Sequence, residues 1–146
     1  TKEIKSNNVN LTITSPPFLD VIEYAQDNWL RCWVNGIDAR SIEKKITTPK
    51  KIEEWTRIMK DVLKELFRVT KPGGHVVFEV GEVQNGKIKL DECITPLGLD
   101  VGFECLGITI NSQTFTKTSS IWGVSNNSKG TNSNRIVIFK KRKCIQ

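Results

Sequence analysis

The residues best suited to chemistry form one short stretch, Ser15 to Phe18, with the sequence Ser-Pro-Pro-Phe. Neither proline has a backbone N–H, and the second proline holds Pro16 in an extended conformation, so the stretch is stiff and cannot continue a β-ladder. The carbonyl groups of Ser15 and Pro16 are therefore available as hydrogen-bond acceptors, with the Ser15 hydroxyl beside them. Phe18 adds an aromatic face for stacking. This combination suits a flat heterocycle that carries an exocyclic amino group.

The residues before this stretch predict a strand that would position it. Val9 to Thr14 alternates apolar and polar side chains and contains two β-branched threonines. In open α/β sheets, ligands bind outside the carboxyl ends of the strands, which is where Ser15 would lie. The alternative interpretation is a rigid strand-to-helix turn with a core phenylalanine. We favour the catalytic interpretation because other segments of the chain support it.

Residues 14–18, Thr-Ser-Pro-Pro-Phe, resemble the Ser/Asp/Asn-Pro-Pro-Tyr/Phe/Trp signature of the amino-methylating DNA methyltransferases. This family uses S-adenosyl-L-methionine to methylate cytosine N4 or adenine N6, and the serine form most resembles the cytosine-N4 branch. Further similarity lies in the Lys-Pro-Gly-Gly sequence at 71–74, in residues 113–118 and in residues 130–135. The resemblance therefore covers nearly the whole chain.

The resemblance implies an α/β fold, namely a partial Rossmann-like S-adenosylmethionine-dependent methyltransferase fold with a mostly parallel sheet and an antiparallel final strand. Residues 1–146 would form a single domain that supplies the fourth to seventh strands, the catalytic half of that fold. The glycine motif F-x-G-x-G, with which the family holds the cofactor, does not occur in this sequence. We therefore expect the chain to pair with the missing N-terminal half of the fold or with a second copy of itself, and to be inactive or nearly so alone.

The resemblance also gives the Ser-Pro-Pro-Phe stretch a chemical role. An exocyclic amine is a poor nucleophile because its lone pair is delocalised into the ring. Hydrogen bonds from its N–H groups to the Pro16 carbonyl and the Ser15 side chain would favour a pyramidal nitrogen and orient its lone pair. Phe18 would stack on the base once it is flipped out of the duplex. The catalytic candidates are Ser15, Pro16, Pro17 and Phe18.

Other polar and aromatic residues are candidates for binding. Those just beyond the motif, and those in the later loop that the resemblance assigns to the target-base pocket, would contact substrate: Asp20, Tyr24, Asn28, Phe115, Thr116 and Lys117. Those at the ends of two strands would contact the cofactor: Thr14, Ser15, Glu79 and Gly81. Glu79 and the nearby Glu82 could equally be solvated carboxylates, and the later loop could equally be a plain surface loop.

The composition limits the possible classes of protein. The 146 residues suffice for one domain with a core, and no run of about 18 apolar residues could span a membrane. The net charge of +6 fits a polyanionic partner such as DNA, although much of the excess lies in residues 140–143 and could be a solvated tail. The four cysteines form no C-x-x-C pair, so we expect no metal site and reduced thiols in a cytoplasmic protein.

Apolar periodicity predicts the elements that follow the motif. Residues 19–34 fit an amphipathic helix, broken near Asn28, with Trp29 and Trp33 in the core. Residues 48–70 form the clearest helix, with Trp55 on its apolar stripe and a start either at Thr48 or nearer Lys51. The remaining expected elements are a turn at 71–74, a central strand at 75–80 covered on both faces, a helix at 90–99, and strands at 103–110 and 135–140.

Two alternatives to a cytosine-N4 methyltransferase remain open on the sequence. One keeps the chemistry and changes the substrate to adenine N6 or to an RNA base. The other is a non-enzymatic, truncated methyltransferase-like module that binds nucleic acid or a catalytic partner. The absent glycine motif favours this module, whereas the intact Ser-Pro-Pro-Phe stretch opposes it.

Overall fold

The computed structural model describes residues 3–17, 19, 24–44, 49, 51–83, 86–112 and 133–143. Within these ranges, helices and strands follow one another in the order expected of an α/β protein. The strands are β1 (Val9–Thr14), β2 (Thr70–Val80), β3 (Glu82–Val83), β4 (Ile88–Lys89), β5 (Phe103–Ser112) and β6 (Ser133–Lys141). The helices are α1 (Tyr24–Asp27), α2 (Trp29–Val34), α3 (Ala39–Glu43), α4 (Ile52–Val69) and α5 (Leu90–Val101).

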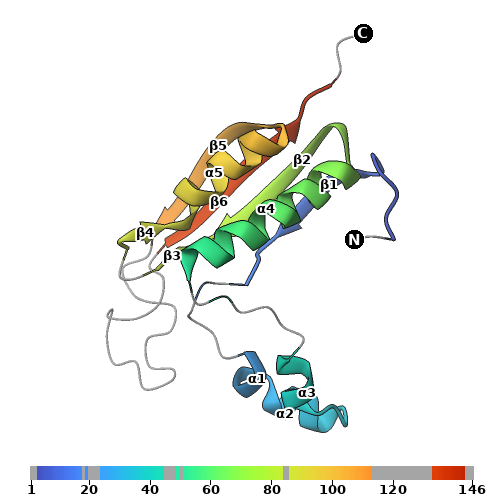
Figure 1. Cartoon of the computed structure of the whole chain (residues 1–146), viewed down its shortest axis with the longest axis vertical. Helices are drawn as coiled ribbons and strands as arrows, with labels where there is room; N and C mark the ends of the chain where they lie inside the picture. Colours follow the sequence, from blue (N-terminus) through green and yellow to red (C-terminus); the bar gives the residue numbers. More distant parts are fainter. Residues whose placement is uncertain are drawn as a thin grey trace.

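In the described part of the chain, four strands form one sheet in the order β1-β2-β6-β5 (Figure 1). β1 and β2 are parallel, and β6 runs antiparallel to both of its neighbours, β2 and β5. β1, β2 and β5 therefore share one direction and only β6 opposes it, which confirms the expected antiparallel final strand. β1 lies at one edge of this sheet. β3 and β4 pair as a separate short hairpin.

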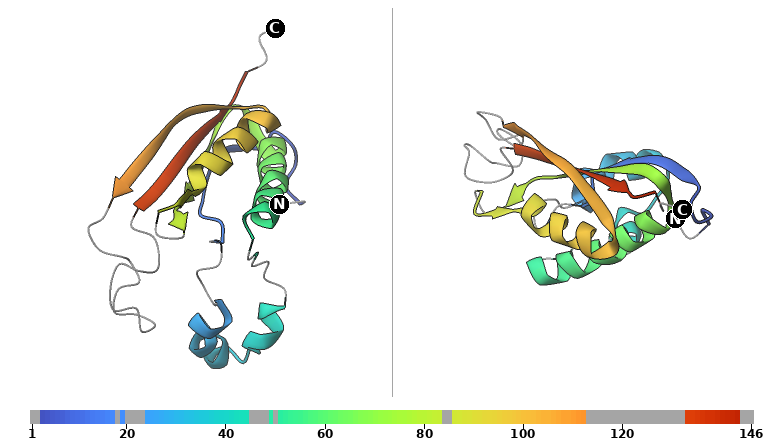
Figure 2. Two further views of the ribbon diagram at one scale, coloured as in Figure 1. Left: turned by 60° about the vertical axis from the view of Figure 1, so that its left-hand side comes forward. Right: turned by 90° about the horizontal axis from the view of Figure 1, so that it is seen from above.

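Helices α4 and α5 cover one face of the sheet, which we call the closed face (Figures 1 and 2). The apolar stripe of α4 packs there, and Trp55 and Leu63 are fully buried. Phe78 on β2 and Phe139 on β6 meet these helices and are also fully buried. The N-cap of α4 is Lys51, so the later of the two expected helix starts is confirmed.

The opposite face of the sheet, which we call the open face, bears Leu11, Ile13, Val77 and Ile138. Ile13 lies opposite Val77, which lies opposite Ile138, so these side chains form a continuous row across three strands. Ile13 is 72% exposed and Leu11 is 53% exposed. The prediction that the central strand is covered on both faces is therefore wrong for the described residues, because α4 and α5 both pack on the closed face.

The expected turn at Lys71–Gly74 lies inside β2 as an irregularity of the strand. The register shifts there, since Val9 pairs with Thr70 and Leu11 pairs with His75. Gly73 has a φ of +83°, a left-handed conformation that favours glycine. The chain therefore leaves α4 and enters β2 at once, without the separate turn that the sequence predicts.

Helices α1, α2 and α3 form a small group beyond the carboxyl ends of β1 and β2 (Figures 1 and 2). Asn28 separates α1 from α2, as expected. The prediction that Trp29 and Trp33 are core residues is wrong, because they are 59% and 72% exposed. α2 faces other short helices rather than the sheet, so its apolar side chains find no layer to pack against. None of the helices in the described ranges is long and apolar enough to cross a membrane.

Candidate active site

The carboxyl ends of β1 and β2 lie side by side and bring several candidate residues together. Thr14 at the end of β1 lies opposite Phe78 in β2. Ser15 directly follows Thr14, and Glu79 directly follows Phe78. Successive side chains alternate between the two faces of a strand, so Glu79 shares the open face with Val77. Ser15 is exposed and Glu79 is half-buried. A hydroxyl and a carboxylate thus lie at the same end of the sheet, and the carboxylate of Glu79 faces away from α4 and α5.

A buried tryptophan fixes the backbone of the Ser-Pro-Pro stretch. The indole Nε1 of Trp55 on α4 donates a hydrogen bond of 3.1 Å to the carbonyl oxygen of Pro17. Trp55 is fully buried, and Leu19 follows the stretch with only 4% of its surface exposed. The stretch is therefore anchored to the helix layer directly after the prolines. This contact joins residues 38 positions apart, and no local pattern in the sequence could reveal it.

The anchored carbonyl differs from its neighbours in the same stretch. Pro17 uses its oxygen for Trp55, whereas no donor among the described residues reaches the Pro16 carbonyl oxygen or the Ser15 hydroxyl. Both prolines are half-buried and Ser15 is exposed. Among the described residues, the two acceptors that the sequence predicts for an amino group are thus held on a stiff backbone without an internal donor.

Glu79 and Gly81, which the sequence predicts to contact the cofactor, lie at the end of β2. Gly81 is buried, and its carbonyl oxygen accepts a hydrogen bond of 3.1 Å from the backbone N–H of Leu90, the first residue of α5. The Glu79 carboxylate on the open face is a hydrogen-bond acceptor that suits the ammonium group of S-adenosylmethionine. This chemistry fits part of that cofactor. The predicted residues, Thr14, Ser15, Glu79 and Gly81, lie at the ends of β1 and β2 and would hold it, and their assignment stays a prediction.

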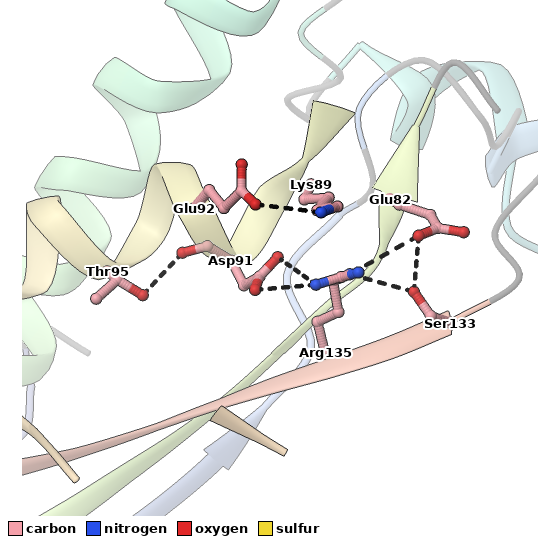
Figure 3. A network of polar contacts seen from close by, with 7 residues as sticks. All are labelled: Glu82, Lys89, Asp91, Glu92, Thr95, Ser133 and Arg135. Atoms are coloured by element: carbon pink, nitrogen blue, oxygen red, sulfur yellow. Dashed lines mark hydrogen bonds and ion pairs between the residues drawn. The ribbon is translucent and has the colours of Figure 1, made fainter. Parts of the chain in front are cut away.

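A network of polar side chains lies next to Gly81 (Figure 3). Arg135 on β6 places its Nη1 3.2 Å from Asp91 Oδ2, and its Nε donates to Ser133 Oγ at 3.2 Å. Ser133 in turn donates to Glu82 Oε2 at 2.9 Å, and Arg135 Nε lies 3.7 Å from the same oxygen. The side chain of Glu82 is only 14% exposed, so the solvated carboxylate that the sequence left open for Glu82 is wrong.

The sequence did not reveal this network, because hydrogen-bonded partners in it, such as Glu82 and Ser133, lie as many as 51 positions apart in the sequence. An isolated arginine near the start of an apolar strand was the only signal. The network also affects its neighbour Cys93 on α5. Burial raises the pKa of the Cys93 thiol, and the carboxylates of Glu92 and Asp91 raise it further, so less of this thiol is ionised at neutral pH.

The remaining candidate residues fall into two groups. Asn28 lies in the α1–α3 group at the N-cap of α2, where its Oδ1 accepts a hydrogen bond of 2.9 Å from Arg31 Nη1. Five others lie outside the described residues: Phe18, Asp20, Phe115, Thr116 and Lys117. For Tyr24, only the backbone is described. The described structure thus brings together the ends of β1 and β2, while the assignment of substrate-binding residues stays a prediction.

Comparison with known proteins places this arrangement in a family. The sequence model of a family described as DNA methylase matches residues 9–145. No curated protein matches the chain. The matched range includes every candidate site residue predicted from the sequence.

Solved structures share the fold. A candidate DNA modification methylase from Thermus thermophilus is 20% identical, with a TM-score of 0.58 over 99% of this chain and 50% of that chain. The same protein complexed with S-adenosyl-L-methionine is 18% identical over the same shares, with a TM-score of 0.58. A SAM-dependent methyltransferase from Methanosarcina mazei is 12% identical, with a TM-score of 0.51 over 97% of this chain and 63% of that chain.

These comparisons confirm the expected Rossmann-like methyltransferase fold and agree with the expected cofactor, S-adenosyl-L-methionine. The chain spans about half the length of the Thermus protein. The fold that the two share therefore continues, in that protein, beyond the part that this chain represents.

Proposed function

Because this chain belongs to the DNA methylase family, we propose that it is the catalytic half of an enzyme that methylates an exocyclic amino group of a DNA base, most specifically cytosine N4. The methyl donor of this enzyme is S-adenosyl-L-methionine. The chain spans half of a structural neighbour, so we assign the activity to the complete protein that carries it.

The contrast between two adjacent carbonyl groups carries this proposal. Trp55 holds the Pro17 carbonyl oxygen at 3.1 Å, and this contact fixes the backbone without using the acceptors before it. Ser15 and Pro16 then present a hydroxyl and a carbonyl oxygen at the carboxyl end of β1. A rigid pair of acceptors at this place matches the two hydrogens of an amino group, and it loses little conformational freedom when a base binds.

The residues would act by orienting the amine. Two hydrogen bonds, to the Pro16 carbonyl and to Ser15, hold the nitrogen in a pyramidal form with its lone pair directed away from the ring. Bound S-adenosylmethionine supplies an activated methyl group. Acceptors that are already in place do not have to reorganise as positive charge develops on the nitrogen, and pre-organised polar groups of this kind lower a barrier by several kcal/mol. Phe18 would complete the site by stacking on the flipped base.

Charge and motif support the substrate class. The net charge of +6 favours a nucleic-acid substrate, because cationic side chains replace counterions along the phosphate backbone. Serine rather than aspartate at position 15 favours cytosine N4, because it resembles the form found in that branch of the family. The proposed contacts to the substrate are Asp20, Tyr24, Asn28, Phe115, Thr116 and Lys117.

The test is methyl transfer by the complete protein to duplex DNA, with labelled cofactor and mass analysis of the released nucleosides. We expect N4-methylcytosine. Ser15→Ala should lower kcat by about 10²-fold, because an acceptor that acts in the transition state is removed. Ser41→Ala in α3 is the matched control, since the Ser41 hydroxyl contacts only the Asp38 carbonyl of its own helical group among described residues, and it should leave kcat unchanged.

Three outcomes separate the alternatives. N6-methyladenine as the product would keep the site and change the base. Methylation of RNA in preference to DNA would change the nucleic acid. Binding of nucleic acid by the complete protein without any methyl transfer would contradict the enzyme and support a binding module.

A further inference from the structure

We propose that Arg135 is a positioning residue that holds the Gly81 turn in the conformation required for cofactor binding. This inference rests on the proposed function, because it assigns a role in the same site. It is carried by the polar network of Figure 3, whose central side chains come from three different elements. These side chains are Glu82 at the start of β3, Asp91 in the first turn of α5, and Ser133 and Arg135 on β6.

The position of the guanidinium makes it the centre of this network. Arg135 lies opposite Val80, the residue that directly precedes Gly81. The side chain of Arg135 is 11% exposed. Its Nη1 contacts both oxygens of Asp91, at 3.3 Å and 3.2 Å. Its Nε donates a hydrogen bond to the Ser133 hydroxyl, and that hydroxyl donates one to the Glu82 carboxylate. One cation thus ties α5 on one side and β3 on the other to the same strand.

Gly81 lies between these tied points. The residue after it, Glu82, belongs to the network through its carboxylate. Its own carbonyl oxygen is bonded to the N–H of Leu90, which directly precedes Asp91. Any movement of Asp91 or Glu82 away from Arg135 therefore displaces the Gly81 backbone, which lies two residues beyond Glu79 on the candidate cofactor side.

The charges show what loss of Arg135 would do. Asp91 is 5% exposed and Glu82 is 14% exposed, and the guanidinium of Arg135 lies within ion-pair distance of both. Without it, two nearly buried carboxylates would face the same space. Buried like charges repel strongly and seek water, so the turn would open locally. Ser133 is also the first residue of β6, so the same cation holds the start of that strand.

The first test measures the turn itself in the complete protein, by amide hydrogen exchange. In Arg135→Gln, the Leu90 N–H should exchange about tenfold faster or more, because its bond to Gly81 opens locally, while the amide of Leu63 in α4 keeps its protection. Arg142→Gln is the matched control, since Arg142 pairs with Glu104 at 3.7 Å on the exposed surface, and it should change neither amide. Equal acceleration at Leu90 and Leu63 would indicate global destabilisation and overturn the proposal.

The second test measures function. Arg135→Gln should raise the Kd and KM for S-adenosylmethionine on the order of 10- to 100-fold, because the Gly81 backbone is displaced from the position that binds the cofactor. The kcat at saturating cofactor should change less, because the residues that orient the amine are not altered. Arg135→Lys should recover part of the affinity, since it retains the charge but not the forked geometry. An unchanged Kd together with faster exchange at Leu90 would overturn the role in cofactor binding.

A milder variant covers the case in which Arg135→Gln does not fold. Ser133→Ala removes the relay to Glu82 and leaves the Arg135–Asp91 pair in place. It should shift the Kd in the same direction by a smaller factor, and no shift would contradict the proposal. If the wild-type protein binds cofactor but transfers no methyl group, the proposed function fails while the Kd measurements still decide the role of Arg135.

Discussion

The two faces of the four-stranded sheet carry similar apolar side chains in opposite surroundings. On the closed face, Phe78, Val137 and Phe139 are completely buried under α4 and α5. On the open face, Ile13 is 72% exposed and Leu11 is 53% exposed, although both belong to the same sheet. The chain therefore builds a full core on one face only. Parallel pairs such as β1 and β2 are normally covered on both faces, and β1 exposes Leu11 and Ile13, so we expect further polypeptide to cover this part of the open face in the complete protein.

This difference also separates two functions of the sheet. The closed face supplies stability and, through Trp55, fixes the Ser-Pro-Pro backbone. The open face carries Glu79 at the end where Ser15 stands, so ligand and additional polypeptide would approach from the same side. Substitutions on the closed face should consequently affect folding of this chain, whereas substitutions on the open face should affect what it binds.

The largest expected effect compares one large side chain from each face. Phe139→Ala should lower the free energy of unfolding of the 146-residue chain by about 3–5 kcal/mol, because it leaves a cavity in a fully buried cluster. Ile13→Ala should lower it by less than about 1 kcal/mol, because that side chain is already in water. Urea unfolding followed by tryptophan fluorescence measures both. Similar losses would show that the open face is covered in solution.

The next effect compares two glycines. A Cβ at Gly98 in α5 would lie 2.3 Å from the ring of the buried Phe139, whereas a Cβ at Gly107 in β5 would meet no atom within 4 Å. Gly98→Ala should therefore cost about 1–2 kcal/mol, since overpacking exceeds the gain in helix propensity. Gly107→Ala should be neutral or stabilising by up to about 1 kcal/mol. Thermal unfolding of the two variants provides the measurement, and a stabilising Gly98→Ala would contradict the tight packing of α5 on β6.

The smallest effect on stability concerns Leu11 and Ile13 together. Replacing both with threonine should change the free energy of unfolding by less than about 1 kcal/mol, because threonine also favours strands. Self-association of the 146-residue chain should fall, because apolar side chains are removed from β1, which is an edge strand of the sheet that the described residues form. Sedimentation velocity measures the change, with Asn10→Ser on the same strand as the control. Unchanged sedimentation would show that this face does not drive association.

The local patterns that predicted the fold correctly are those that depend on few neighbours. The apolar stripe of residues 52–69 predicts α4, and Gly102, with a φ of +111°, ends α5 where the next strand begins. Asn28 predicts the break between α1 and α2. These features follow from backbone conformation and helix periodicity, which are encoded within a few residues.

Tryptophan burial shows where such patterns stop being sufficient. Trp55 and Trp33 both lie on helices at positions that periodicity assigns to an apolar face, yet Trp55 is fully buried and Trp33 is 72% exposed. Periodicity states that a helix has an apolar face, and it does not state which layer lies opposite. For α4 that layer is the sheet, whereas α2 lies among short helices beyond it. The core assignment of Trp29 and Trp33 failed for this reason.

The sequence by itself determined which residue types the candidate site contains and the order of the four strands of the main sheet and of helices α4 and α5. Ser15, Pro16 and Pro17 define the acceptors and the stiffness of the backbone, because these are properties of side chains and of proline itself. Only the tertiary structure decided which acceptor is used internally, which face of the sheet is covered, and how Arg135 joins Asp91 to Glu82. Those contacts join residues 38 to 53 positions apart, and they exist only because packing of the helices on the sheet brings distant segments within hydrogen-bond distance.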